Sequence, residues 1–401
     1  MRDTSTSNKR TAPGRGEILL VLSLCLLATM TIRMRTEMFS PATPAWNEPV
    51  DHWKYEYVAE HPLGSFHIQP TCWRIGVPLL TRLLPFSTYR NFEILTLLFY
   101  VLSGVMVYLW LLAIPRPRDE AILGVILFYS MGAVVKLVLG GVETPDPGSY
   151  FFTLLALYAI YTGQDFLCAA ALALGMFTKE TLMVAVPLHY SLKAAGLFDM
   201  KRLRRSILVG APAVIVFVAI RMLIPAWNDR DDYVRSLPFI YTQVSAGKVN
   251  YDLRTAFEGT IRTYRDYTPV DLLRLFTWGS LGVPFFLPFF DLKENRKLLI
   301  RWAPYVFPIL ATLLIALNAD RRMGSLFPVL IVMGLNGVRA LSARLDASTR
   351  DFQVIFLLLF ALQLLKTNVA IVPFDLSAAV FLFSIGWLLY RRQPRYRIGT
   401  F

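Results

Sequence analysis

The sequence predicts an all-α protein that crosses a membrane many times, and three observations lead to this fold class. Of the 401 residues, 55% are hydrophobic, and the mean hydropathy is +0.48. Only 17% are charged, against about a quarter in an average soluble domain. Apolar runs recur from end to end, and a helix is the usual way to satisfy backbone hydrogen bonds inside a bilayer. We therefore expect a single integral-membrane domain over residues 1–401, with about twelve transmembrane helices.

The apolar runs that we expect to span the membrane are separated by charged, proline-rich or glycine-rich turns. The fourth, fifth and sixth runs are short, at about 13 residues each, against the roughly 20 that cross a bilayer unaided. In chain order, the runs cover residues 18–32, 92–114, a run ending near 139, 150–162, 166–177, 182–195, a run ending near 225, 275–290, a run ending at 318, a run ending at 338, 352–365 and 376–390.

The basic residues predict how the chain is oriented. The formal net charge of +13 is spread over short clusters between apolar runs, as the positive-inside rule expects, and this distribution argues against nucleic-acid binding. Residues 1–17 are basic and precede an apolar run without a small-residue cleavage site, so we expect a cytoplasmic tail. Alternation then places the C-terminus in the cytoplasm and residues 33–90 and 226–274 outside, as two large external loops. We expect amphipathic helices in the first loop, and a cell inner membrane as the location.

The cysteines and the acidic residues say little about a metal. Cys25 and Cys168 lie inside apolar runs and only Cys72 lies in a large loop, so a disulfide framework is excluded. The acidic stretch at 229–232 resembles a divalent-cation cluster, although an exposed acidic turn explains it as well. A divalent cation is therefore a candidate cofactor, and the sequence assigns no metal ligand.

Ionisable residues gather at the external ends of the predicted spans. Such groups are costly at membrane depth and are usually functional or paired. For any one of them, a solvated loop edge is an equally good interpretation, but their shared face favours a site. They are Asp51 beside His52, Arg74, Glu143 with Asp146, Lys179 with Glu180, and Asp320 with Arg321 and Arg322.

Short motifs around these residues resemble the GT-C superfamily of integral-membrane glycosyltransferases. The D-x-x-x-Y of Asp51 to Tyr55 falls where that family has its catalytic acid, and WRIGVPLL around Arg74 is similar to the R-x-L-x-P-x-L pattern that follows it. Three later stretches also resemble elements of the family: ETPDPGSYFF with Asp146, TKETLMVAVPL with Lys179 and Glu180, and Asp320-Arg321-Arg322 with Pro328. No D-x-D or E-x-D triplet occurs near Asp51, which leaves metal use open.

The resemblance implies transfer of a sugar from a polyprenyl-phosphate donor to an acceptor glycan, lipid or protein at the outer face of the membrane. Asp51 is the expected general base, which takes the proton of the acceptor. The leaving phosphate calls for cations, and carboxylates would contact substrate or metal. The residues expected to bind the substrate are Arg74, Asp146, Lys179, Glu180, Asp320, Arg321 and Arg322.

Two other functions fit the same sequence. A transporter or flippase for a lipid-linked or anionic solute would have broken spans, polar groups near the midplane and usually a repeat between its halves. The ionisable residues lie mostly at span ends and no repeat is evident, so this is the second interpretation. A non-catalytic membrane subunit of a polysaccharide assembly system is the third.

Overall fold

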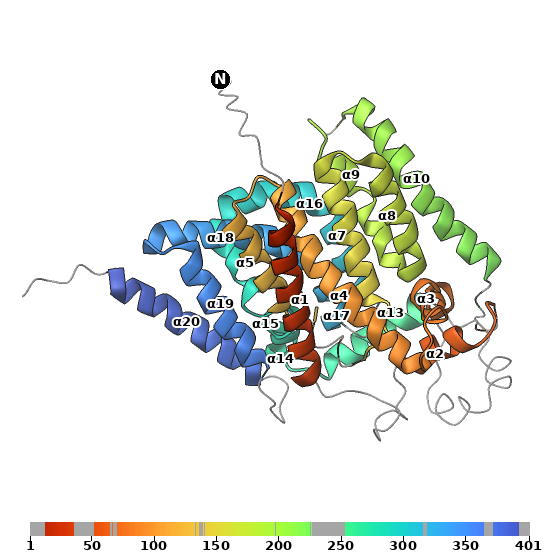
Figure 1. The fold of residues 1–401 in the computed structure, drawn as a ribbon, viewed down its shortest axis with the longest axis horizontal. Coiled ribbons are helices and arrows are strands. Elements are labelled where there is room, and N and C mark those ends of the chain that lie inside the picture. Colours follow the sequence, from red (N-terminus) through yellow and green to blue (C-terminus); the bar gives the residue numbers. More distant parts are fainter. Residues whose placement is uncertain are drawn as a thin grey trace, which may run out of the picture.

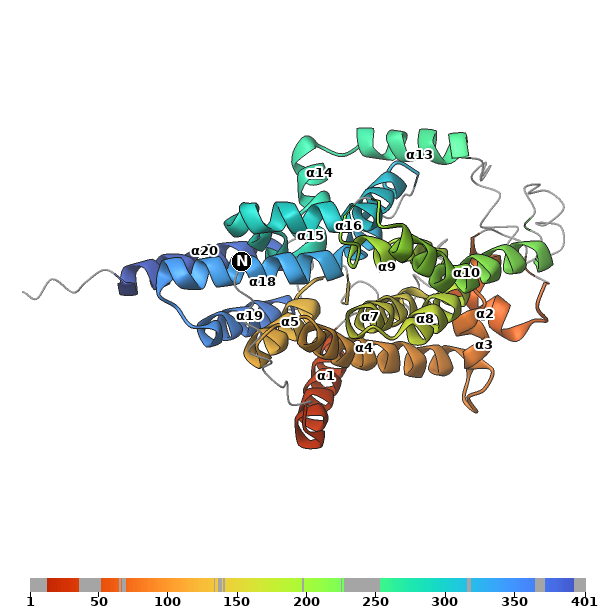
Figure 2. The same cartoon turned by 90° about the horizontal axis from the view of Figure 1, so that it is seen from above.

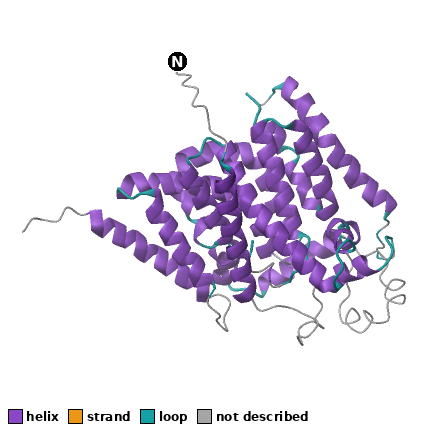
Figure 3. Ribbon diagram, viewed as in Figure 1, coloured by secondary structure: helices purple, strands orange, loops and turns teal. Residues whose placement is uncertain are grey.

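The protein is all-α, as predicted. The computed structural model describes residues 13–35, 52–64, 66, 70–132, 134–135, 139, 141–196, 198–224, 226, 253–315, 319–364 and 372–392, and the regular structure within these ranges is helical with no strand (Figure 3). The α-helices are α1 (Arg15–Arg35), α2 (His52–Glu60), α3 (Gly76–Thr81), α4 (Thr88–Ala113), α5 (Arg118–Tyr129), α7 (Asp146–Thr162), α8 (Asp165–Thr178), α9 (Leu188–Ser191), α10 (Met200–Leu223), α13 (Leu253–Arg265), α14 (Pro269–Phe276), α15 (Trp278–Leu281), α16 (Leu292–Thr312), α17 (Ala319–Gly324), α18 (Phe327–Leu345), α19 (Thr349–Gln363) and α20 (Val372–Arg392). The 3-10 helices are η2 (Thr71–Trp73), η3 (Glu180–Ala185), η4 (Val283–Phe285) and η5 (Leu287–Asp291).

The helices form one bundle with two sides. On one side α4, α7, α8 and α10 pack next to one another in sequence order (Figure 1). On the other side α18 packs against η5 and α5, and α19 packs against α5 and α20. Between the two sides the buried rings of Trp110 and Trp302 meet edge to face at 6.4 Å. The helix α1 lies outside this bundle against α4, and α13 lies along the opposite edge (Figure 2).

Large apolar side chains are exposed on the outer helices, as a lipid-facing surface requires. On α1, Leu19 and Leu27 are more than half exposed, and on α10 the same holds for Leu208 and Ile215. These faces belong to helices that are long and apolar enough to cross a membrane. The protein is accordingly a membrane protein.

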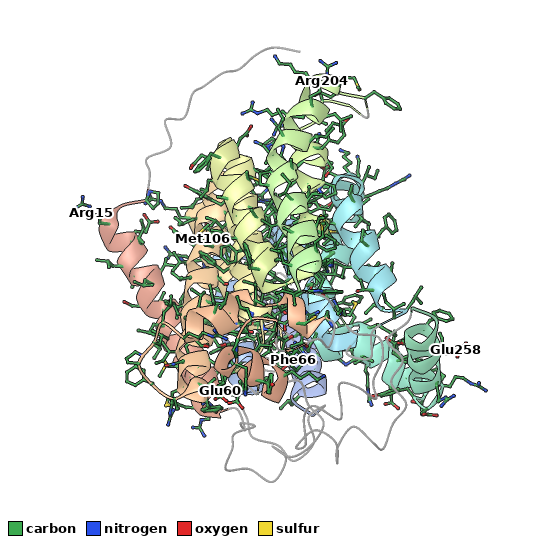
Figure 4. All side chains as sticks on the ribbon, turned by 90° about the vertical axis from the view of Figure 1, so that its right-hand side faces the viewer. Arg15, Glu60, Phe66, Met106, Arg204 and Glu258 are labelled. Atoms are coloured by element: carbon green, nitrogen blue, oxygen red, sulfur yellow. The ribbon has the colours of Figure 1, made fainter. Side chains whose placement is uncertain are left out.

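The loops and turns are sorted to two ends of the bundle. Arg15, at the start of α1, and Arg204, in the basic first turns of α10, lie at one end (Figure 4). Glu60 and Phe66 of the first large loop lie at the opposite end together with Glu258 of the second (Figure 4). Alternation of the chain predicts this separation. Which end faces the cytoplasm stays a prediction from the basic residues.

The number of spans is smaller than the twelve expected from the sequence. In the described part of the chain, four helices are long and apolar enough to cross a membrane, namely α1, α4, α10 and α18. A fifth span is counted if residues 269–281 and 283–312, which are bent by 100° at the break between them, are taken together. The remaining apolar helices are shorter, such as α7 with 17 residues and α8 with 14. The count of twelve is thus not confirmed.

Two predicted spans are broken by residues that do not continue an α-helix. The run over 182–195 forms η3 and then the four-residue α9, with Pro187 between them. The run over 275–290 breaks at Gly282, whose φ of 65° is in the region that favours glycine. Beyond it, Pro284 and Pro288 stand in the 3-10 helices η4 and η5.

The basic stretch at 291–301, predicted to be a turn, is the first half of α16. Asp291 is its N-cap and accepts a hydrogen bond from the backbone N–H of Glu294 at 3.4 Å. A side-chain cap of this kind satisfies one of the free donors at a helix start. The run of charges in this stretch resembles a solvated turn, which hides the cap in the sequence.

A close approach of α18 to η5 gives the first testable prediction. A Cβ on Gly337 would lie 1.8 Å from the carbonyl oxygen of Leu287, so the backbone would have to move. A Cβ on Gly334 would meet only side-chain carbons, of Leu287 and Leu127, at 3.3 Å or more. We expect Gly337→Ala to lower the free energy of unfolding of the purified protein by about 1–3 kcal/mol or more, as measured by denaturation. The matched control Gly334→Ala should change it much less, and equal effects of the two substitutions would contradict this close packing.

Candidate functional site

Asp146 binds two cations from separate parts of the chain. It is the first residue of α7, where the helix dipole favours a carboxylate. Its completely buried carboxylate forms ion pairs with Lys179 Nζ through Oδ1 and with Arg321 Nη2 through Oδ2. Burial alone would raise the pKa of Asp146, but the charges of Arg321 and Lys179 outweigh it and hold the pKa well below its usual range. This carboxylate therefore ties α7 to the end of α8 and to α17.

A second ion pair lies beside the first. The guanidinium of Arg74 donates to both oxygens of Glu180, from Nε at 2.8 Å and from Nη2 at 2.5 Å. Its Nη1 donates to the hydroxyl of Tyr55 in α2 at 2.9 Å. Arg74 is buried, whereas the side chain of Glu180 is 23% exposed. Burial tends to raise the pKa of Glu180, yet the adjacent Arg74 lowers it to about 2, so this pair is ionised at neutral pH.

Arg322 is the cation of this cluster that has no counter-ion in the described structure. No hydrogen bond or ion pair joins its guanidinium to any residue in the described ranges. The pKa of Arg322 is lowered by burial and by the like charge of Arg74, and Glu180 and Asp146 offset this only in part. Its neighbour Lys179 also has a lowered pKa, of about 8, because burial outweighs the attraction of Asp146. Burial is the main cause of both shifts, and the like charges of the neighbouring cations add to it.

Arg221 is a further cation that the sequence analysis did not select. It lies in the last turn of α10, and its guanidinium stacks over the rings of Trp73 at 4.3 Å and Phe217 at 3.4 Å. Trp73 in turn donates from Nε1 to the carbonyl of Ile224 at 2.9 Å, which fixes the ring against the end of α10. A signal was present in the sequence, because a single arginine interrupts the apolar run AIRML, and ionisable residues in such runs are usually functional.

These residues form a cation cluster, defined as Arg74, Lys179, Arg221, Arg321 and Arg322. They come from the loop before α3, the break between α8 and η3, the end of α10, and α17. Among the described residues the two carboxylates that interact with them are Asp146 and Glu180. Five cations against two carboxylates leave a formal excess of three positive charges in a partly buried place. Such an excess favours the binding of an anion.

A pair of buried polar side chains lies just ahead of Asp146. Glu143 is completely buried, and neither of its carboxylate oxygens has a hydrogen-bond partner in the described structure. The hydroxyl of Thr144 is likewise buried and unpartnered. The pKa of Glu143 is raised to about 8, mainly by burial and further by the nearby charge of Glu56, whose own pKa is raised to about 7 by burial and by Glu60. The carboxyl of Glu143 is therefore mostly protonated near neutral pH, and that of Glu56 about half protonated.

The structure brings together most of the residues that the sequence singled out. Six of them, Arg74, Asp146, Lys179, Glu180, Arg321 and Arg322, meet in one cluster. The expected base, Asp51, lies outside the described residues, although α2 begins at the next residue and contacts Arg74 through Tyr55. Asp320 belongs to α17, but its side chain lies outside the described part. The roles assigned to these residues stay predictions.

No group of three or more histidine, cysteine, aspartate or glutamate side chains lies close enough to hold a metal ion within the described ranges. The acidic stretch at 229–232 falls outside them. The three cysteines are free and buried. His189 is buried, with Nδ1 at 2.8 Å from Ser206 Oγ and Nε2 at 3.3 Å from Asp165 Oδ1.

Comparison with known proteins gives a similarity of structure and none of sequence. No family model matches the sequence, and no curated protein matches it. The fold is similar to the crystal structure of an oligosaccharyltransferase from Archaeoglobus fulgidus, tethered to an acceptor peptide with the NVT sequon by a disulfide bond. The two share 12% identity and a TM-score of 0.48, over 94% of this chain and 55% of that one, so this chain spans about half the length of that protein.

Proposed function

We propose that the protein is a membrane glycosyltransferase that moves a sugar from a polyprenyl-phosphate donor to an acceptor glycan, lipid or protein. The observation that carries this proposal is the excess positive charge of the cation cluster, together with Arg322, which has no counter-ion in the described structure. A phosphate that leaves with a bonding electron pair needs such charge around it. The helices α3 and α17 of the site lie at the same end of the bundle as α2 and α13 (Figure 1). We assign this end to the outer face of a cell inner membrane, with both termini in the cytoplasm.

The proposed reaction is a single displacement. The acceptor oxygen or nitrogen forms a bond to the anomeric carbon of the sugar, and the bond from that carbon to the phosphate oxygen breaks. The acceptor gives its proton to Asp51, and the carrier phosphate departs with the electron pair. Arg322 and Arg221 contact the departing phosphate oxygens, with Arg74, Lys179 and Arg321 behind them, because the last three already share their charge with carboxylates.

Asp146 and Glu180 position these cations. Without Asp146, Lys179 and Arg321 would repel each other across a buried space. Without Glu180, Arg74 would lose its two charge-assisted hydrogen bonds and the fixed orientation that they give. We place Asp320 with these carboxylates as a substrate contact or as a ligand of a divalent cation. Membrane lipid surrounds the whole site.

The test of the function is the substitution Asp51→Asn. We expect it to abolish transfer of radiolabelled sugar from a polyprenyl-phosphate sugar to acceptor in proteoliposomes, because the amide cannot take the proton. Expression, monodispersity and thermal stability should match the wild type. The control Asp119→Asn removes a carboxylate at the start of α5 and should leave transfer unchanged. Full activity of the Asp51→Asn variant would remove Asp51 from the reaction, and absence of any transfer by the wild type would contradict the function.

A transporter of a lipid-linked or anionic solute is the second candidate, and one observation favours it. Broken helices are common at the substrate sites of secondary transporters, and residues 269–281 and 283–312 are bent by 100°. The cation cluster, however, is built from α3, α8, α10 and α17 and their neighbouring turns, and not from this break. Transport of labelled lipid or solute by the Asp51→Asn variant at the wild-type rate would favour this candidate.

A further inference from the structure

The segment over 141–144 carries three buried polar side-chain atoms that nothing in the proposed reaction uses. Both oxygens of Glu143 and the hydroxyl of Thr144 are buried and have no hydrogen-bond partner among the described residues. Glu143 is completely buried. Buried polar atoms are nearly always hydrogen-bonded, because leaving one without a partner costs free energy. Three such atoms on consecutive residues indicate a place that is completed by a ligand.

The backbone around these side chains is held firmly. Thr96 of α4 donates a hydrogen bond from its hydroxyl to the carbonyl of Val142 at 2.7 Å. The side chain of Val142 is buried in one apolar cluster with Tyr55 of α2 and Phe92 and Phe99 of α4. The unpartnered atoms therefore do not arise from a loose loop. They belong to a fixed segment that α2, the helix just after the expected base, helps to cover.

The chain position of these residues relates them to the cation cluster. Thr144 is separated by one proline from Asp146, which binds Lys179 and Arg321. In a donor lipid the sugar is bonded directly to the phosphate. If the cation cluster holds the phosphate, the sugar ring therefore lies within a few ångströms of the cluster. The hydroxyl groups of the ring then need hydrogen-bonding partners in the surrounding protein.

We propose that Glu143 and Thr144 form a subsite that binds hydroxyl groups of the donor sugar. The inference rests on the proposed function, since it takes the phosphate of the same donor to lie on the cation cluster. The carboxyl of Glu143 donates one hydrogen bond and accepts another, and the hydroxyl of Thr144 adds a third.

Two observations favour hydroxyl groups over a cation at this subsite. The raised pKa of Glu143 means that the carboxyl is mostly neutral near pH 7, a state that suits a neutral hydroxyl partner. A divalent ion would in addition need more ligands than the described residues bring together here.

The test compares a lipid without a sugar with the same lipid carrying one. Binding to the full-length protein in nanodiscs is measured for a polyprenyl phosphate and for the same lipid carrying glucose, mannose or galactose. We expect the wild type to bind one glycosylated lipid more tightly than the bare lipid. Glu143→Leu should lose about tenfold or more of the affinity for that lipid and keep its affinity for the bare one. Glu143→Gln, which is neutral and still donates and accepts, should stay within about threefold of the wild type.

A matched pair of threonine substitutions separates ligand contact from packing. Thr144→Val should weaken binding of the glycosylated lipid by about threefold to tenfold. Thr153→Val removes a hydroxyl that is already bonded to the backbone of Ser149 in α7 at 2.8 Å, and it should leave the preference for the glycosylated lipid unchanged. Equal effects of Thr144→Val and Thr153→Val on that preference would overturn the assignment.

The remaining outcomes distinguish this inference from the proposed function. If the wild type binds neither the bare nor any glycosylated lipid, the proposed function fails. If the wild type binds the bare lipid but prefers no glycosylated one, or if Glu143→Leu keeps the preference, the subsite alone is overturned. Loss of the preference in Glu143→Gln and after treatment of the wild type with EDTA would identify a metal site instead. An effect of Glu143→Leu on the KM of the acceptor alone would reassign the residues to the acceptor.

Discussion

Replacing Arg322 with glutamine is expected to lower transfer about a hundredfold or more and to leave the protein at least as stable as the wild type. The activity falls because a positioned donor to developing negative charge typically contributes about 10²–10³ in kcat. Stability does not fall, because the guanidinium forms no ion pair or hydrogen bond with any described residue and lies near the like charge of Arg74. Steady-state transfer kinetics and thermal denaturation of the same preparations measure the two effects.

The control for Arg322 is Arg204→Gln. Arg204 carries the same charge but lies at the other end of the bundle (Figure 4), so the substitution should change neither kcat nor stability. A marked loss of stability in Arg322→Gln would mean that the arginine has a structural partner and is not held ready for a ligand. Unchanged transfer would remove it from the reaction and would weaken the argument from excess charge.

Replacing Asp146 with asparagine is expected to give the largest loss of stability in the chain, about 3–5 kcal/mol. The amide keeps the shape of the side chain but removes the negative charge, so that Lys179 and Arg321 face each other unbalanced in a buried place. Breaking a buried pair by removing one partner is costly for this reason. Unfolding in detergent, followed by circular dichroism, measures the effect, and transfer should fall with it because two cations lose their positions.

The control for Asp146 is Glu294→Gln, which removes an acidic partner from a surface pair. Glu294 and Lys297 are 55% and 68% exposed, so solvent already screens them and the substitution should have little effect. A second variant, Asp146→Asn with Lys179→Met, removes one of the stranded cations and should recover part of the stability. Failure to recover any of it would show that the loss comes from packing at the start of α7 and not from charge.

The fold class and most members of the cluster could be predicted from the sequence, whereas Arg221 and the pairing within the cluster could not. Alternating loops placed Arg74, Asp146 and Lys179 on the same side because that argument needs only the order of the spans. Which carboxylate meets which cation depends on helix packing. Asp146 takes both Lys179 and Arg321, while Glu180, adjacent to Lys179 in sequence, turns to Arg74. Neighbours in sequence therefore joined different ion pairs.

Other features were missed for identifiable reasons. Arg221 was not recognised because it lies in an apolar run, and a single charge hardly changes the mean hydropathy of such a run. The runs at 182–195 and 275–290 were predicted as whole spans from hydropathy alone, although Pro187, Pro284 and Pro288 in them argued against continuous α-helices. The buried state of Glu143 could not be predicted from the sequence, because its position beside Asp146 resembled a solvated turn.

The double use of Asp146 has a consequence for how a donor would enter. Lys179 and Arg321 are already paired with the carboxylate of Asp146. A phosphate can therefore bind these two cations only together with Asp146 or in place of it. Binding of the phosphate then weakens the ion pair between Asp146 and Arg321, which joins α7 to α17. Binding of a lipid headgroup would thus weaken the contact between two distant stretches of chain. The protein without a donor would be the more rigid of the two forms at this point.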